Sequence, residues 1–389
     1  MNADVLVVGL GAMGSAALYQ LARRGAKAVG VDRFRPPHVY GSSHGETRIT
    51  RQAIGEGEAY VPFVLRSHQI WRELEAISGR ELFLACGGLI LSGKTGKATH
   101  HSKPEFLNRT IRAARAFGIE HELLDTAQIA ERFPQLGLRD EERGYWEPGA
   151  GLVYPERCVE VQLEQAIGLG AAVRTGERVL RVAAEKDGVT VQTDLATHHA
   201  DRVIVSAGPW VAELLGEPLT RAVRVYRQVL FWFEAEQPEQ YAPGRFPIFI
   251  WTHGEYDGQH FYGFPDVGSG VKIATEQDQV STSPDDAERA VADAEAERMF
   301  EAHARGRLLG LKGRPHQSAT CLYTSTPDGD FILDRHPDSE RVLIASPCSG
   351  HGFKHSAAVG EAMAAWAVAG AAPLDLSPFS LSRFAPAGP

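Results

Sequence analysis

Short apolar runs and one helical pattern follow each other at the start of the chain. Residues 4–8 (DVLVV) and 28–32 (AVGVD) are continuous apolar runs, which are typical of strands buried on both faces of a sheet. Residues 16–25 (AALYQLARRG) have a helical pattern that ends at Gly25, a residue type that commonly terminates helices. This order predicts a βαβ unit of about 30 residues.

Comparable segments recur in the middle of the chain and near its end. Residues 201–211 (DRVIVSAGPWV) predict a buried strand, a glycine turn and a helix, and residues 331–370 predict two strands, a glycine-rich turn and an alanine-rich helix. Between these parts, residues 222–276 alternate as antiparallel strands do. Further helices are expected at 58–80, 104–118, 159–171 and 284–308.

The turn after the first predicted strand is a GxGxxG motif formed by Gly9, Gly11 and Gly14. The motif alone is weak, but here it follows a strand, opens a helix and precedes Asp32 at the end of the next strand. Gly9 permits the tight turn, Gly11 lets the backbone approach a pyrophosphate, and Gly14 lets the helix pack closely on the strand. The helix N-terminus offers donors to phosphates, and Asp32 can accept hydrogen bonds from a ribose.

Asp32 and a later strand and turn favour FAD over NADP and NAD. The carboxylate of Asp32 argues against NADP, because it would repel the 2′-phosphate. The small-residue turn in RVIVSAGPW (202–210) resembles the late turn that passes near the flavin in FAD enzymes, and an NAD dehydrogenase has no evident need for it. We therefore expect FAD.

The fold class that follows is α/β (α+β), with a Rossmann-like FAD-binding domain of discontinuous segments and an inserted, mainly antiparallel-sheet substrate domain. We assign residues 1–80, 145–215 and 318–389 to the first domain, and residues 81–144 and 216–317 to the second. The length of 389 residues is sufficient for two domains.

Composition narrows the classes of partner. The chain is 43% hydrophobic and 23% charged, as globular enzymes are, and has a net charge of −9. Without a Lys/Arg-rich stripe, this acidity makes nucleic acids and anionic membranes poor partners. No apolar run is long enough to predict a transmembrane helix. Four dispersed cysteines without a CxxC pair argue against a disulfide framework or a zinc site and favour a reducing, cytoplasmic location.

A basic cluster could bind an anion. Residues 40–52 (YGSSHGETRITRQ) contain Arg48 and Arg51 beside His44. Arginine suits a carboxylate because its planar fork donates two parallel hydrogen bonds. A solvated basic loop explains the same residues equally well, so the cluster alone does not establish a binding site.

A second candidate segment lies near the end of the chain. Residues 346–355 (SPCSGHGFKH) repeat the strand–glycine–helix pattern and could bring backbone N–H groups and Lys354 to an anion or to the flavin edge. His351 and His355 are four residues apart but lack a third ligand, so we expect no metal site.

Several longer motifs are shared with one enzyme family. They are GLGAMGS (9–15), PPHVYGSSHGETRITR (36–51), EGEAYVP (56–62), YRQV (226–229), YGFP (262–265), CLYTSTPDGDFILD (321–334), SGHGFK (349–354) and DLSPFSLSRF (375–384). With them the chain resembles, over essentially its whole length, the monomeric sarcosine oxidase family, which includes N-methyltryptophan oxidase. The resemblance implies a monomeric flavoenzyme. It would oxidise the C–N bond of a small N-methyl amino acid to an imine, which water hydrolyses, and would reduce O₂ to hydrogen peroxide.

The resemblance also implies roles for individual residues. Cys321 would hold FAD covalently, by a thioether to the 8α carbon of the flavin. Arg51 and Lys354 would bind the substrate carboxylate, and Arg48 would lie close to the flavin.

Three more positions follow from the same resemblance. Lys272 falls where the family lysine assists O₂ activation, which suits the negative charge that develops on oxygen; without the family, a strand-edge lysine would be the simpler interpretation. Tyr262 matches a tyrosine of the substrate pocket, and His44 keeps the position of a family histidine.

The residues expected at the cofactor come from these segments and their neighbours. They are Gly9, Gly11, Ala12, Met13, Gly14, Asp32, Arg33, Ser42, Ser43, Arg48, Val179, Ala207, Gly208, Trp210, Cys321, Gly350, Gly352, Phe353 and Lys354.

Glu276 departs from the family pattern, because relatives that act on sarcosine have a histidine four residues after the pocket lysine. The carboxylate could pair with a cationic amine or a basic side chain, or could face solvent. It leaves the substrate open, with N-methyltryptophan and cyclic imino acids such as pipecolate or proline as alternatives. A dehydrogenase of the same fold with a non-oxygen acceptor and a non-catalytic nucleotide-binding module are further alternatives.

Overall fold

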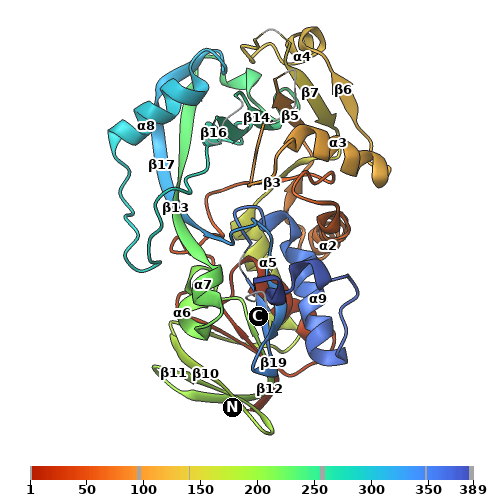
Figure 1. Cartoon of the computed structure of the whole chain (residues 1–389), viewed down its shortest axis with the longest axis vertical. Helices are drawn as coiled ribbons and strands as arrows, with labels where there is room; N and C mark the ends of the chain where they lie inside the picture. Colours follow the sequence, from red (N-terminus) through yellow and green to blue (C-terminus); the bar gives the residue numbers. More distant parts are fainter. Residues whose placement is uncertain (1, 94–97, 140, 255–258, 347, 385–389) are drawn as a thin grey trace, which may run out of the picture.

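The computed structural model describes residues 2–93, 98–139, 141–254, 259–346 and 348–384. The strands of these residues form two eight-stranded sheets and one three-stranded sheet. The first sheet, which contains the N-terminal strand, lies at one end of the long axis and the second sheet lies at the other end, with strand β3 of the small sheet between them (Figure 1). The functional cavities lie where these sheets meet.

The first sheet has a parallel centre. Its strand order is β10 (Val179–Glu185), β11 (Gly188–Thr193), β12 (Thr197–Val205), β1 (Asn2–Val8), β2 (Ala28–Asp32) and β9 (Ala172–Thr175), while β19 (Ser339–Ala345) pairs with β12 and with β18 (Leu333–His336). Val5 of β1 lies opposite Ala28 on one side and Arg202 on the other. The predicted βαβ unit is present, and β10 and β11 pair antiparallel.

Both faces of β1 are buried, which explains its continuous apolar sequence. Val5 and Val7 pack into a core with α1 (Ala12–Arg23), α2 (Val61–Ser78), α5 (Pro155–Gly168) and α9 (Ser356–Ala369). Leu6 and Val8 pack on the opposite face with residues of β11, α6 (Val211–Leu215) and α7 (Leu219–Ala222). The helices α1 and α9 pack so closely that a Cβ at Gly360 would lie 2.4 Å from that of Ala16.

The second sheet is antiparallel except for one strand pair. Its order is β17 (Leu311–Ser325), β13 (Arg224–Ala235), β16 (Val271–Ala274), β15 (His260–Phe264), β14 (Ile248–Thr252), β5 (Gly88–Ser92), β7 (Arg143–Glu147) and β6 (Glu122–Leu124), and only β14 and β5 are parallel neighbours. Helices α3 (Phe106–Ala116), α4 (Thr126–Arg132) and α8 (Asp293–Met299) lie at this end of the molecule (Figure 1). The predicted domain boundaries at 144/145 and 317/318 fall inside β7 and β17.

The three-stranded sheet consists of β3 (Arg48–Thr50), β8 (Gly151–Val153) and β4 (Phe83–Leu84). Strand β3 pairs with β8 so that Arg48 lies opposite Val153. Arg48 therefore lies on a hydrogen-bonded strand and Arg51, directly after it, is buried, so a solvated loop is the wrong interpretation of these two arginines.

The helix predicted at 284–308 is shorter than expected. Only Asp293–Met299 is α-helical, followed by a π-helical turn over Phe300–Ala304. The guanidinium of Arg227 donates to the carbonyl oxygens of Glu288 and Ala290, at 2.7 and 2.6 Å, and so binds acceptors that a continuous helix would use. None of the described helices is long and apolar enough to cross a membrane.

The close contact of the glycine turn with α1 generates a prediction about stability. A Cβ at Gly14 would lie 1.8 Å from the carbonyl oxygen of Gly9, whereas one at Gly168, at the end of α5, would meet nothing within 4 Å. Gly14→Ala should lower the free energy of unfolding by roughly 1–3 kcal/mol or more, because the backbone must move apart. Gly168→Ala should raise it by about 0.5–1 kcal/mol through reduced chain entropy. Urea denaturation measures both, and equal stability of the two variants would contradict this packing.

Candidate active site

A cavity of about 270 Å³ lies at the carboxyl ends of β1, β2 and β19. Ligands of open α/β sheets bind at such strand ends. One wall is the glycine turn before α1, where Gly9 has a φ of +83° and an added Cβ would lie 2.5 Å from the carbonyl oxygen of Ser206. The helix begins at Ala12 in this wall, so its positive dipole end lies at the cavity.

Asp32 lines the same cavity, and its carboxylate is fixed by the backbone. One oxygen accepts a hydrogen bond from the N–H of Leu10 and the other from the N–H of Phe34, both at 2.7 Å. Burial raises the pKa of Asp32, and these two hydrogen bonds oppose the shift. Because each carboxylate oxygen has two lone pairs, the fixed group can still accept a hydrogen bond from a ligand hydroxyl.

Most of the residues expected at the cofactor line this large cavity. They are Gly9, Gly11, Ala12, Met13, Asp32, Arg33, Ser42, Ser43, Arg48, Val179, Ala207, Gly208, Trp210, Gly350, Gly352 and Phe353. Gly14 is instead packed against Gly9, while Lys354 lines a second cavity. Cys348, which has no expected role, also lines the large cavity.

The second cavity is smaller, at about 60 Å³, and adjoins the first. Both are lined by Arg48, Tyr323, Gly350 and Phe353. The expected catalytic residues Arg51, Tyr262, Lys272 and Lys354 all line the small cavity, although they come from distant parts of the chain. The structure therefore brings together most of the residues that the family resemblance implies.

Arg51 and Lys354 share one buried counterion, the carboxylate of Glu56. Arg51 Nη2 lies 2.5 Å from Oε2 of Glu56, and Lys354 Nζ lies 3.4 Å from Oε1. Burial alone would raise the pKa of Glu56, but the two cations hold it well below its usual range. Burial lowers the pKa of Lys354 to about 8, although Glu56 opposes the shift.

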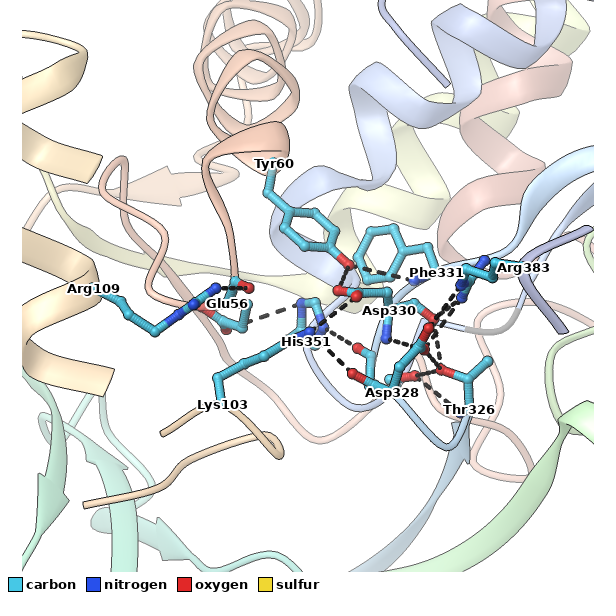
Figure 2. Close-up of polar contacts among 12 residues, drawn as sticks. Glu56, Tyr60, Lys103, Arg109, Thr326, Asp328, Asp330, Phe331, His351 and Arg383 are labelled. Atoms are coloured by element: carbon cyan, nitrogen blue, oxygen red, sulfur yellow. Dashed lines mark hydrogen bonds and ion pairs between the residues drawn. The ribbon is translucent and has the colours of Figure 1, made fainter. Parts of the chain in front are cut away.

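Arg109 of α3 fixes the backbone at Glu56, the residue that carries this carboxylate. Its guanidinium donates to the carbonyl oxygens of Gly55 and Glu56, at 2.7 and 3.0 Å. Figure 2 shows Arg109 and His351 on two sides of Glu56.

Lys272 is buried beside aromatic rings. Its ammonium donates to the carbonyl oxygens of Gly45 and Thr47, at 2.8 and 2.6 Å, and lies 3.9 Å from the ring centroid of Phe264. Burial and the nearby charge of Arg48 lower its pKa well below the usual range. Two of its three N–H donors are used by the backbone, so one remains for a ligand in the cavity.

Of the predicted catalytic and substrate residues, His44 and Glu276 line neither cavity. His44 is buried, and burial together with the charge of Arg48 lowers its pKa to about 3, so this imidazole is neutral at physiological pH. Glu276 lies behind the wall of the small cavity, where its carboxylate contacts His101 and His260. An outward-facing Glu276 is therefore the wrong alternative.

The thiol of Cys321 is buried on β17 and does not line the large cavity. It packs with Leu230, Trp232 and Ala274, while Tyr323, two residues further along the strand, lines both cavities. Burial raises the pKa of this thiol, and Arg48 and Lys272 oppose the shift.

Several residues of the small cavity were not expected from the sequence. Glu56 lies in the EGEAYVP motif, but the motif alone assigns it no role. His100 and His101 form a dipeptide outside the motifs, and Tyr323 lies inside the motif of Cys321, where its hydroxyl is 3.1 Å from that of Tyr262. An adjacent pair of histidines before a proline was the only local signal available for the first two.

Among the described residues, one group of side chains approaches the arrangement of a metal site. The ligand atoms of His100, His260 and Glu276 lie within 4.8 Å of one another. Ligands of tetrahedral zinc are roughly 3.4 Å apart, given bonds of about 2.1 Å. Since Glu276 is also paired with His101, we assign the group to a cluster of contacting imidazole and carboxylate side chains, and the absence of a metal remains a prediction.

Comparison with known proteins places this architecture in a family. A family model described as FAD dependent oxidoreductase matches residues 4–366. The chain belongs to this family. The large cavity fits the cofactor, because a glycine turn without room for a Cβ, a helix N-terminus and a fixed carboxylate are the groups that bind a dinucleotide.

Individual relatives cover nearly the whole chain. Monomeric sarcosine oxidase of Bacillus sp. (strain NS-129) is 37% identical over 98% of this chain and 96% of the relative. N-methyl-L-tryptophan oxidase of Salmonella agona (strain SL483) is 34% identical over 99% of this chain and 100% of the relative. The open form of NikD, an unusual amino acid oxidase essential for nikkomycin biosynthesis, has a TM-score of 0.84 and 24% identity, with 97% of each chain covered. The last similarity shows the fold.

The pKa of Lys354 predicts how the FAD-dependent oxidoreductase binds anions. Its ammonium is charged below about pH 8 and neutral above it. The Kd of propionate, measured from the flavin absorbance, should therefore rise about 10-fold or more between about pH 6.5 and 9.5, because a hydrogen bond to a charged group contributes about 1.5–3 kcal/mol. Lys354→Met should bind propionate weakly at every pH, and its Kd should not depend on pH in this range. Lys312→Met removes an exposed ammonium and should keep the pH dependence of wild type; the same pH dependence in Lys354→Met would contradict the assignment.

Proposed function

We propose that this chain is a flavin-dependent oxidase of a small N-methyl amino acid such as sarcosine. It converts the C–N bond to an imine, which is hydrolysed to an aldehyde and an amine, and it produces hydrogen peroxide. The main support is the small cavity, where Arg51 and Lys354 lie together beside the wall shared with the dinucleotide cavity. The relatives named sarcosine oxidase and N-methyltryptophan oxidase support the same class of reaction.

In this proposal, Arg51 and Lys354 bind the substrate carboxylate. The buried carboxylate of Glu56 already pairs with both of these cations. A substrate carboxylate of the same charge would compete with Glu56 for their donors. Two fixed cations at one end of a cavity orient the rest of a small amino acid, which is catalysis by positioning.

FAD, when bound, accepts two electrons from the amine and passes them to O₂. The protein must supply a neutral amine for that reaction, and the cations of the small cavity lower the pKa of a bound ammonium. We assign the activation of O₂ to Lys272, because an N–H donor of a buried lysine stabilises the negative charge that forms on oxygen.

The cavity volume favours a small substrate over an aromatic one. At about 60 Å³, the space between Arg51, Tyr262 and Lys354 suits sarcosine better than an N-methylated indole amino acid. A cyclic imino acid oxidase and a dehydrogenase of the same fold are distinguished from this proposal by the substrate used and by peroxide formation in air.

We further propose that the cofactor is bound covalently through the sulfur of Cys321. The residue lies on β17 two positions before Tyr323, which lines both cavities. Burial raises the pKa of its thiol, and the charges of Arg48 and Lys272 partly oppose this rise, which disfavours the reactive thiolate. Cys348 lines the large cavity directly and provides a matched control.

Acid precipitation of the purified protein tests the attachment. The wild-type pellet should be yellow, Cys321→Ala should release all flavin into the supernatant, and Cys348→Ala should keep a yellow pellet. Flavin in the wild-type supernatant would mean noncovalent binding, and a colourless Cys348→Ala pellet would move the attachment to that residue.

Rapid-mixing kinetics test the role of Lys272. In Lys272→Met, reoxidation of the reduced flavin by O₂ should slow by at least about 10²-fold, because removing a charge-stabilising donor commonly costs 10²–10³ in rate. Anaerobic reduction by sarcosine should change much less, and wild type should release peroxide in proportion to sarcosine consumed. Fast reoxidation in Lys272→Met would remove the assignment, and no peroxide from wild type would favour the dehydrogenase.

A further inference from the structure

His101 lies at the tip of a tight turn that reaches the small cavity from the second sheet. The turn follows β5 and precedes α3, and His100 and Lys103 close it through two backbone hydrogen bonds of 3.1 and 2.9 Å. Its central residues, His101 and Ser102, have φ values of +50° and +60°. A left-handed conformation is unfavourable for a residue with a side chain, and such strain is retained where the surroundings require the position.

Contacts with residues 328–330, which follow β17, fix this turn. Lys103 Nζ donates to the carbonyl oxygen of Asp328 at 3.0 Å and pairs with the carboxylate of Asp330 at 2.9 Å. His351 binds the carbonyl oxygen of Gly329 between them, at 2.9 Å. Figure 2 shows Lys103 and His351 directed to this 328–330 turn, with Glu56 beside His351.

The imidazole of His101 is oriented by Glu276. Its Nδ1 pairs with a carboxylate oxygen of Glu276. Burial disfavours the charge of this carboxylate, but the paired His101, together with hydrogen bonds from His101 and His260, holds its pKa well below the usual range. An ionised carboxylate can only accept, so Nδ1 carries the hydrogen, and in the neutral imidazole the lone pair is then on Nε2.

The free nitrogen of His101 lies at the substrate end of the cavity. The side chain is only 11% exposed, and Nε2 is 3.9 Å from the Glu56 carboxylate that pairs with Arg51 and Lys354. His101 lines the cavity together with these residues. A substrate carboxylate held by the two cations would place its amine, one carbon away, within the same small space.

We propose that His101 is a catalytic base that accepts the proton of the substrate ammonium, with Glu276 as its positioning residue. The proposal rests on the proposed function, since it concerns an amine substrate of this site. The N–H bond of the ammonium breaks, its electron pair stays on the amine nitrogen, and the proton bonds to Nε2 of His101. No electrons are transferred in this step.

Two carboxylates near His101 favour the transfer of a proton to its imidazole, and two cations oppose it. Glu276 and Glu56 stabilise an imidazolium, whereas Lys354 and Arg51, which lie behind Glu56, destabilise it. The neighbouring rings of His100 and His351 add no charge, because burial lowers the pKa of both well below the usual range. The cations that lower the pKa of the amine are thus separated from the base by a carboxylate.

The test is the pH profile of anaerobic flavin reduction by sarcosine in the holoenzyme. At pH 7, His101→Gln should be slower than wild type by about 10²-fold or more, as expected for loss of a general base. The deficit should shrink towards twofold above about pH 10, where the substrate amine is largely neutral without help. Glu276→Gln keeps an acceptor for Nδ1 but loses the charge, and should show a smaller deficit with the same dependence on pH.

Two controls separate a catalytic role from a structural one. The Kd of propionate, which has no amine, should be unchanged within about twofold in His101→Gln if the cavity is intact. His199→Gln, at an exposed position of β12, should match wild type at every pH. A deficit of equal size at all pH values, or no deficit at pH 7, would overturn the base assignment. If wild-type flavin is not reduced by sarcosine or another N-methyl amino acid at any pH, the proposed function itself fails, and the base assignment fails with it.

Discussion

Arg51 and Lys354 are buried together, and two adjacent buried cations are stable only when a counterion neutralises them. Glu56 provides that counterion, and its own position is fixed by Arg109 from α3 (Figure 2). Three parts of the chain are thereby joined at one carboxylate. They are the segment after β3, the turn before α9, and helix α3 at the end of the molecule that holds the antiparallel sheet. The small cavity depends on this arrangement, because without it the two cations could not remain buried beside each other.

The two large sheets supply different groups to the site. The parallel sheet supplies strand ends, a glycine turn and Asp32, which suit a dinucleotide. The antiparallel sheet supplies Tyr262 and Lys272 from neighbouring strands, and these suit the reacting end of the cavity. Strand β17 links the two parts, since Tyr323 at its end lines both cavities.

Charge is distributed around the small cavity in a way that matches oxidation of an amino acid. The cations of the cavity attract a carboxylate and lower the pKa of an ammonium. The proton released by that shift needs an acceptor, and His101 with Glu276 lies beyond Glu56, where an added positive charge is neutralised. The glutamate that replaces the expected family histidine thus acts on the cavity through a neighbouring imidazole.

The sequence by itself determined the features that depend on local geometry. The glycine motif with Asp32 predicted the βαβ unit and a dinucleotide, because a turn without room for a Cβ has a short and specific pattern, and the small-residue turn at 202–210 favoured FAD. Family motifs identified Arg51, Tyr262, Lys272 and Lys354, which the structure places in one cavity. Only the tertiary structure decided the partners of these residues. It showed that Glu56 neutralises two cations, that Glu276 faces inward to His101, and that Arg227 binds the carbonyl groups where a long helix was expected. Each of these depends on side chains that are far apart in the chain and meet only after the sheets have packed.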